Sequence, residues 1–276
     1  MALTALQRRV CRLLADRRVS AGQERYVAGG VALNDALGGA RVSRDIDLFH
    51  DTEEALEAAS RADIDALRVA GLSVVEGRRV RGFVDVTVRD EIGDTVEVQW
   101  VRDSAFRFFP LVLTPDLGLI LHPFDLATNK VLALVGRVAA RDWIDILTCH
   151  ERLSPLGCLA WAASGKDPGL NPLFILEEAA RTAHYPAVEL DSLEFEGPPP
   201  DRATLTMTWR AALSQARHIV DRLPVEQIGK AVLRADGTPF HGSAAELDAA
   251  VAAGDLVFHP GTIGGAVPVV RARSGA

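Results

Sequence analysis

The stretch YVAGGVALNDALGGARVSRDIDLFHD, residues 26–51, constrains the fold more than any other part of the chain. Gly29 and Gly30 follow a short apolar segment, and farther on Asp45 and Asp47 alternate with apolar residues. Side chains alternate along a strand, so the two aspartates point to one face while their apolar neighbours face the core. Two carboxylates on one face repel each other unless a cation lies between them. The pattern therefore indicates a cation site next to a glycine turn.

The residues around the two aspartates are suited to phosphate. Gly29 and Gly30 stand at the start of a helix-like run, where the backbone can approach a ligand and N–H groups without helical partners can bind it. Arg41 and Ser43 come just before the aspartates and offer a guanidinium group and a hydroxyl to phosphate oxygens. A bare D-x-D is also common on a solvated strand edge. The combination with the glycine pair is much more specific.

Hydrophobic periodicity and turn residues predict an α/β front half, with a small mixed or antiparallel sheet, and a mostly helical back half. Strands are expected over residues 26–28 and 45–50 and within 72–90 and 94–103, with turns at Gly77 and Gly93. Helices are expected over 1–19, 31–39, 52–71, 124–152 with a break near Gly136, twice between 154 and 185, over 203–234 and over 243–254. The proline-rich segment FEGPPPD, residues 195–201, is expected to be a linker between domains.

The composition is that of a soluble globular protein, with 48% hydrophobic and 24% charged residues in a chain of 276. A net charge of −7 argues against a protein that coats nucleic acid without specificity. Three cysteines without a C-x-x-C pair are typical of a reducing compartment. No apolar run approaches the roughly 20 residues of a membrane helix. The twin arginine near the start is followed by residues too charged for a signal core, so a cytoplasmic protein is expected.

The glycine pair, the short helix and the R-x-S-x-D-x-D pattern together resemble the nucleotidyltransferase superfamily of DNA polymerase β. The variant GGVALNDALGGARVSRDIDLF is most similar to the AbiEii/AbiGii toxin family of bacterial nucleotidyltransferases. The resemblance implies an α+β fold, in which a polymerase β-like core with a small mixed sheet flanked by helices precedes a mostly helical C-terminal half. It implies a nucleotidyltransferase domain over residues 1–125 and a helical domain over 126–194 that completes the active site. The resemblance does not explain the region after the linker, where pattern and composition predict a C-terminal helical and Gly/Pro-rich extension over 202–276.

By this resemblance Asp45 and Asp47 are catalytic and hold Mg²⁺, or Mn²⁺ in its place, while the glycine pair with Arg41 and Ser43 binds the nucleotide. Superfamily members usually carry a third acidic residue on a neighbouring strand, where the candidates are Asp85 and Glu97. Glu97 is the preferred metal ligand. Gln99 lies on the same strand face, so a different strand register would place an amide at this position instead. An amide replaces an anionic metal ligand poorly.

A second landmark lies in NKVLALVGRVAARDWIDIL, residues 129–147. On one continuous helix, four charged residues would lie within roughly 80° of one another: Lys130, Arg137, Arg141 and Asp145. Asp142 would lie outside that face. The family has a similar helix, in which the lysine contacts nucleotide phosphates and a late aspartate supports the site. The resemblance therefore implies that Lys130 is catalytic and nucleotide-binding and that Asp145 is catalytic. The alternative is a surface helix with ordinary ion pairs.

The implied activity is Mg²⁺-dependent transfer of a nucleoside monophosphate from an NTP, ATP among them, to an acceptor hydroxyl. By resemblance the protein acts as the toxin of a type IV toxin–antitoxin system, with tRNA as an acceptor and a separately encoded antitoxin as a partner. Two alternatives stay open: transfer to a small molecule or a protein, and a non-catalytic nucleotide-binding module. Arg78, Arg79 and Arg81 form either a solvated strand edge or a contact with RNA backbone. His50 is expected in a loop or a helix cap.

Overall fold

A computed structural model describes residues 3–15, 25–137, 139–181, 185 and 187–269. It divides into two compact units. The first unit comprises Met1–Ala105, Leu111–His122 and the short segment Glu194–Gly197. The second comprises Phe106–Pro110, Pro123–Leu193 and Pro198–Ala276. Glu194–Gly197, the part of the chain in which a linker was predicted to begin, thus belongs to the first unit.

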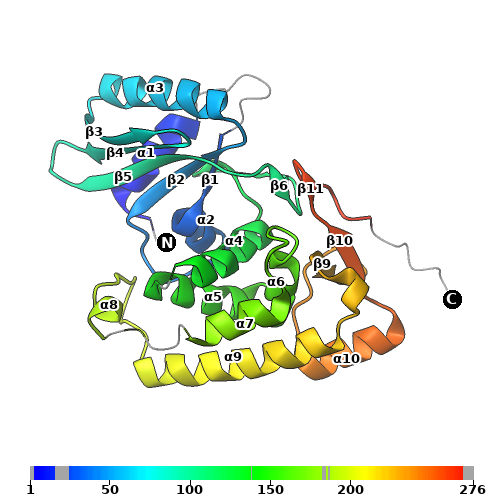
Figure 1. The fold of residues 1–276 in the computed structure, drawn as a ribbon. Coiled ribbons are helices and arrows are strands. Elements are labelled where there is room, and N and C mark those ends of the chain that lie inside the picture. The colour runs from blue at the N-terminus through cyan, green and yellow to red at the C-terminus, as the bar shows by residue number, and fades with distance from the viewer. Residues whose placement is uncertain (1–2, 16–24, 138, 182–184, 186, 270–276) are drawn as a thin grey trace. The chain divides into compact units, whose positions relative to one another are not determined.

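A mixed sheet with strand order β3-β4-β5-β2-β1-β8-β7 forms the first unit (Figure 1). The strands β2 and β5 run parallel, as do β1 and β8, and the other neighbours are antiparallel. The predicted α+β fold with a mixed sheet is confirmed. The strands are β1 Arg25–Ala28, β2 Asp45–His50, β3 Ser73–Val80, β4 Phe83–Arg89, β5 Thr95–Arg102, β7 Val112–Thr114 and β8 Gly118–Ile120. The helices of this unit are α1 Ala5–Ala15, α2 Gly29–Leu37 and α3 Glu53–Val69.

Burial alternates along the central strands and gives the sheet two different faces. Ile46 and Leu48 of β2 are buried, whereas Asp45 and Asp47 between them are only partly buried. On the apolar face, the indole N–H of Trp100 donates a 3.0 Å hydrogen bond to Asp63 of α3. Because α3 covers this face (Figure 1), the aspartates of β2 point to the opposite side of the sheet, as the sequence pattern predicts.

The predicted turn at Gly77 is wrong, because this glycine lies inside β3 and the chain turns at Gly82. A methyl group at Gly77 would lie 2.0 Å from Asp85 Oδ1, and the register shifts between Glu76 and Arg79. The glycine therefore marks a bulge where two strands approach closely rather than a turn. Gly82 has φ +76°, the left-handed conformation that the real turn requires.

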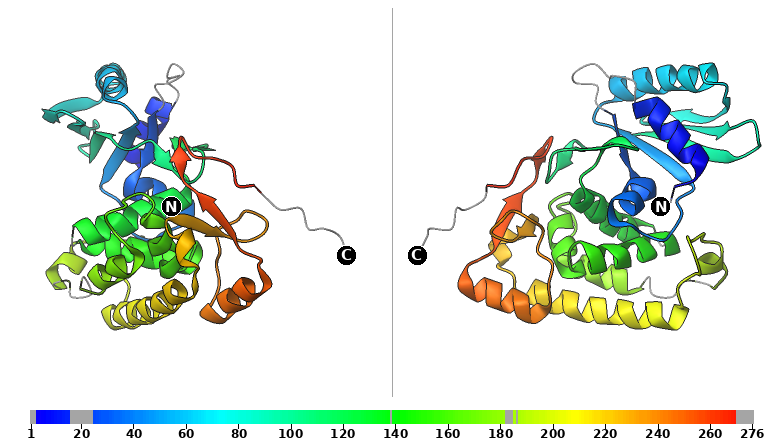
Figure 2. Two further views of the ribbon diagram at one scale, coloured as in Figure 1. Left: turned by 45° about the vertical axis from the view of Figure 1, so that its right-hand side comes forward. Right: turned by 180° about the vertical axis from the view of Figure 1, so that it is seen from behind.

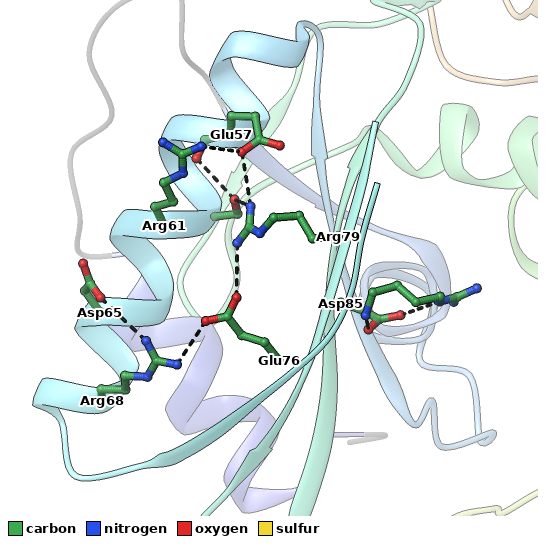
Figure 3. A network of polar contacts seen from close by, with 9 residues as sticks. Glu57, Arg61, Asp65, Arg68, Glu76, Arg79 and Asp85 are labelled. Carbon is green, nitrogen blue, oxygen red and sulfur yellow. Dashed lines mark hydrogen bonds and ion pairs between the residues drawn. The ribbon is translucent and has the colours of Figure 1, made fainter. Parts of the chain in front are cut away.

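The exposed charges of α3 and β3 form a chain of ion pairs (Figure 3). Arg79 pairs with Glu57 of α3 and with Glu76, and Glu76 in turn pairs with Arg68. Asp85 lies on the other side of the strands (Figure 3). It pairs with Arg78 at 3.0 Å. Two of the three arginines considered for RNA contact are thus paired with acidic residues of their own unit, which favours the solvated strand edge.

The second unit is mostly helical, as predicted for the back half. Its helices are α4 Pro123–Gly136, α5 Ala140–Arg152, α6 Leu156–Ala163, α7 Pro172–Arg181, α8 Ala187–Asp191, α9 Arg202–Arg222 and α10 Ala244–Ala253. Short strands pair as β9 Lys230–Leu233 with β10 Val257–Pro260, and as β6 Phe106–Arg107 with β11 Thr262–Ile263. The long α9 packs against α10 (Figure 2). Among the described helices, none has the length and apolar character that a membrane span requires.

The predicted helix over 203–234 is too long, because α9 ends at Arg222 and is followed by a turn of 3₁₀ helix, Val225–Gln227. Pro224 cannot continue a helix, since it lacks the backbone N–H. The strand β9 then takes up residues that had been assigned to the helix. The short helix predicted over 243–254 is confirmed as α10, which begins with a capping box between Ser243 and Glu246.

His50 lies at the end of β2 and is fully buried, so the predicted loop or capping role is wrong. Its two ring nitrogens have no hydrogen-bond partner among the described residues. Burial, together with the charge of Arg25 opposite it on β1, lowers the pKa of His50 from 6.5 to about 4. The Arg25 guanidinium pairs with Asp63, so this corner of the core contains a buried ion pair beside a neutral imidazole.

We expect His50 to make the folding stability depend on pH. Because the folded-state pKa is depressed, the unfolded chain binds the proton more tightly between about pH 4 and 6.5. The free energy of unfolding therefore falls as the pH drops through this range. A shift of this size corresponds to about 3 kcal/mol. Denaturant titrations at several pH values should show a flatter profile for His50→Leu than for the wild type, and identical profiles would contradict this assignment.

Candidate active site

The two aspartates of β2 lie at the centre of the sheet, flanked by strands on both sides. Asp47 is opposite Ala28 of β1, so it stands directly beside the point where β1 ends and α2 begins. On the other side, β5 places Glu97 next to Asp45 and Gln99 next to Asp47. The open face of the sheet thus presents both carboxylates beside the start of a helix.

Gly29 is the first residue of α2 and packs directly against Asp47. A methyl group at this position would lie 1.7 Å from Asp47 Oδ2, and Gly29 has φ +65°. The preceding residue, Ala28, has no side chain that could cap the helix. The first N–H groups of α2 have no acceptor within the helix, and they stand next to the carboxylate. Backbone donors of this kind bind anions such as phosphate.

Gly30 provides room for the second pair of predicted residues. A methyl group there would lie 2.5 Å from Arg41 Nη2 and 2.6 Å from Ser43 Oγ. The Ser43 hydroxyl donates a 2.9 Å hydrogen bond to Asp45 Oδ1. The structure therefore brings together the glycine pair, Arg41, Ser43 and the aspartates, as predicted from their residue types and spacing.

Two residues that were not predicted from the sequence bind the backbone of the segment between α2 and β2. Asn34 of α2 donates from Nδ2 to the Arg41 carbonyl at 2.7 Å, and Gln7 of α1 donates from Nε2 to the Ser43 carbonyl at 2.5 Å. Both side chains are buried. A buried amide on an otherwise apolar helix face is a detectable signal in the sequence, but the sequence does not reveal its partner.

The third acidic position is less clearly formed. Glu97 is exposed and lies next to Asp45, while Gln99 lies between Asp47 and Asp85 across three strands. Asp85 is ion-paired with Arg78. Within the residues that the structure describes, no three His, Cys, Asp or Glu side chains are grouped in a way that could hold a metal ion.

Lys130 and the two aspartates of α5 form a buried cluster in the second unit. The Lys130 ammonium lies 2.9 Å from Asp142 Oδ1 and 2.9 Å from Asp145 Oδ2, and Arg137 also pairs with Asp142. Burial alone would raise the pKa of Asp142, but the charges of Lys130 and Arg137 outweigh it and keep the pKa below its usual value.

The break expected near Gly136 is confirmed, and the projection of Lys130 and Asp145 onto one continuous helix face is therefore wrong. The chain leaves the helical path after Gly136, and α5 starts at Ala140. This break changes the angular relation between α4 and α5, so Asp142, which the helical spacing had placed off the face, contacts Lys130 as closely as Asp145 does.

Comparison with known proteins assigns the chain to a protein family. A model of the family described as "Nucleotidyl transferase AbiEii toxin, Type IV TA system" matches residues 12–217, a longer span than the motifs alone cover. No curated protein matches the chain.

Among solved structures, the chain is similar to MenT4, a nucleotidyltransferase toxin from Mycobacterium tuberculosis H37Rv. The TM-score is 0.58 at 18% identity, over 80% of this chain and 83% of that one. It is also similar to a putative nucleotidyltransferase from H. pylori, with a TM-score of 0.50 at 15% identity, over 80% of this chain and 99% of that one. At these identities the likeness shows a shared fold. Because the family model spans most of the sequence, the chain belongs to the AbiEii family of nucleotidyltransferase toxins of type IV toxin–antitoxin systems.

Proposed function

We propose that this nucleotidyltransferase transfers a nucleoside monophosphate from a magnesium-bound NTP to a hydroxyl of an RNA acceptor, with tRNA as the first candidate. The observation that carries the proposal is the contact of Gly29 with Asp47. It places a carboxylate beside the first N–H groups of α2, a helix whose N-cap residue, Ala28, makes no side-chain hydrogen bond to them. A triphosphate with its cation has the charge pattern that this pair of groups complements.

The donor set fits a magnesium ion. Asp45 and Asp47 project from the same face of β2 and offer the oxygen ligands that Mg²⁺ prefers, and Mn²⁺ accepts the same ligands. The absence of a side chain at Gly29 lets Asp47 Oδ2 lie against the start of α2. When bound, the ion would neutralise charge on the triphosphate and activate the attacking hydroxyl.

The other residues of the first unit would orient the nucleotide. The N–H groups at Gly29 and Gly30 would donate to phosphate oxygens, and the Arg41 guanidinium would add a charged donor. Ser43 donates to Asp45, which fixes one oxygen of that carboxylate. The reaction needs little covalent chemistry from the protein, so catalysis would rest on this positioning and on charge.

Lys130 and Asp145 stay in the proposal in the roles that the family resemblance implies, with the lysine contacting phosphates and the aspartate supporting it. Their buried ion pair also joins α4 to α5, which gives both residues a structural role within the second unit. Substitution of either residue would therefore be expected to affect folding as well as transfer.

The proposed setting is a bacterial cytoplasm, where NTPs and tRNA are available and where free thiols such as the three buried cysteines are stable. The proposed partner is a separately encoded antitoxin, as in other type IV systems of this family. The acidic net charge of −7 means that an RNA acceptor would be held by local contacts rather than by the charge of the whole protein.

Incubation with Mg²⁺, each labelled NTP in turn and total RNA tests the proposal. We expect label in the RNA fraction from at least one NTP, in the tRNA size range, and none after treatment with EDTA. Label on the protein itself or on a small molecule would show that the acceptor is a protein or a small molecule and not RNA. Bound nucleotide without transfer to any of these would contradict the proposed reaction.

We further propose Glu97 as the third metal ligand, since it is the neighbour of Asp45 and its exposed side chain can turn toward the pair. Glu97→Gln removes the charge at nearly constant shape, and we expect the transfer rate to fall on the order of 100-fold, or about 2.7 kcal/mol in activation free energy. Transfer is measured with labelled NTP at saturating Mg²⁺.

Gln99→Glu is the informative counterpart, because it moves the third charge next to Asp47. If Glu97 is the ligand, the double variant Glu97→Gln/Gln99→Glu should recover only a small part of the lost rate. Full transfer by Glu97→Gln alone would show that Glu97 holds no metal ion.

A further inference from the structure

The segment Ala40–Arg44, which leads into β2, is held on one side by residues far along the chain. Its residues belong to no regular helix or strand and form only an isolated bridge, Arg41 opposite Phe195. The Val42 N–H donates to the Glu194 carbonyl at 2.9 Å, and the Glu196 N–H donates to the Ala40 carbonyl at 2.7 Å.

These two hydrogen bonds alternate with the two that come from the helices. Asn34 and Gln7 donate to the carbonyls of Arg41 and Ser43, on the opposite edge of the segment. The backbone of the segment is thus fixed from both edges, by α1 and α2 on one edge and by residues 194–196 on the other. An ion pair between Arg44 and Glu194 also joins the two segments. Both side chains are exposed, so this pair contributes little to the stability of the pairing.

The sequence of this distant segment suits a short, well-defined pairing. Gly197 has φ +86°, a conformation that glycine adopts without strain, and it ends the pairing directly after Glu196. Pro198, Pro199 and Pro200 follow, and prolines have no N–H with which to extend a strand. The glycine and the prolines therefore confine the pairing to Glu194–Glu196.

We infer that residues 194–197 are a positioning element of the nucleotide site. Arg41 and Ser43 lie within the paired segment and pack against Gly30, so a shift of the segment moves the guanidinium and the hydroxyl away from the helix start. The inference rests on the proposed function, because the ligand whose binding depends on this position is the triphosphate. Release of the pairing weakens nucleotide binding and leaves the aspartates of β2 in their strand.

The test compares two changes at one position. Glu196→Pro removes the N–H that donates to Ala40, whereas Glu196→Ala removes only the side chain. Isothermal titration with a non-hydrolysable NTP analogue and Mg²⁺ should give about a tenfold higher Kd for Glu196→Pro, which is the loss of about 1.4 kcal/mol. Glu196→Ala and Glu194→Ala should bind as the wild type does. The KM for NTP should rise with the Kd, while kcat changes by less than about twofold.

Hydrogen exchange provides a readout that is independent of nucleotide. The Val42 amide should lose protection in Glu196→Pro and keep it in Glu196→Ala. Gly197→Ala offers a milder change in case the proline variant does not fold, since a methyl group there meets no atom within 4 Å and only strains the backbone. It should raise the Kd about twofold to fourfold, with a matching loss of protection at Val42.

Two results overturn the inference. One is a Glu196→Pro protein that exchanges faster at Val42 but binds the analogue as tightly as the wild type. The other is an equal loss of binding in Glu196→Ala, which would assign the effect to the side chain. Failure of the wild type to bind any of the four NTPs would instead overturn the proposed function, and this inference with it, so the two failures are distinguishable.

Discussion

Asp47→Asn should abolish nucleotidyl transfer while the protein stays folded. The asparagine keeps the shape of the side chain that packs against Gly29, but it removes the negative charge that would hold a divalent cation. We expect the rate to fall by about 1000-fold or more, which corresponds to about 4 kcal/mol in activation free energy. The measurement is transfer of label from NTP at saturating Mg²⁺, with circular dichroism and the Tm recorded for both proteins.

Asp65→Asn is a matched control for this change. Asp65 lies on α3, which covers the opposite face of the sheet, and its side chain is exposed. The same loss of one charge there should leave transfer within about twofold of the wild type, because exposed charges are screened and contribute little. Equal activity of Asp47→Asn and Asp65→Asn would contradict the assignment of Asp47 to the active site.

Gly29→Ala should be nearly as damaging as loss of the aspartate. The added methyl group would lie 1.7 Å from Asp47 Oδ2, a distance that no relaxed structure tolerates, and the backbone at φ +65° is strained for alanine. Either Asp47 or the start of α2 has to move. We expect at least a 100-fold lower transfer rate, and a loss of about 1–3 kcal/mol in stability measured by denaturant titration.

Gly71→Ala is the control that distinguishes backbone strain from the steric clash with Asp47. Gly71 has φ +82°, but a methyl group there meets no atom within 4 Å. Its substitution should cost stability of about 1 kcal/mol and leave transfer unchanged. If Gly29→Ala behaves in the same way, the close contact with Asp47 has no role in transfer.

The grouping of the first-unit site could be predicted because it depends on local rules. Alternation along a strand puts Asp45 and Asp47 on one face, and glycines at a helix start favour close approach of another group. Both rules act within a few residues, so they hold whatever the rest of the fold is. The strand β2 and the helix α2 accordingly lie where the pattern indicates.

Interactions between segments far apart in the sequence could not be predicted in this way. The register between β2 and β5 decides that Glu97 neighbours Asp45 and that Gln99 neighbours Asp47, and the sequence of either strand alone leaves this register open. The break near Gly136 was expected, but the contact of Asp142 with Lys130 across it was not, because the helical projection holds only for an unbroken helix. Residues 195–201 were predicted to be a linker because glycine and proline are common in linkers, yet the start of this segment forms a short edge pairing.

A crystal structure with Mn²⁺ and a non-hydrolysable NTP analogue would show whether Asp45 and Asp47 hold the metal ion of the nucleotide. We expect an anomalous manganese peak within about 2.0–2.3 Å of carboxylate oxygens of Asp45 and Asp47. We also expect phosphate oxygens within hydrogen-bond distance of the N–H groups at Gly29 and Gly30. Nucleotide bound elsewhere on the protein, with the two aspartates free of metal, would contradict both expectations.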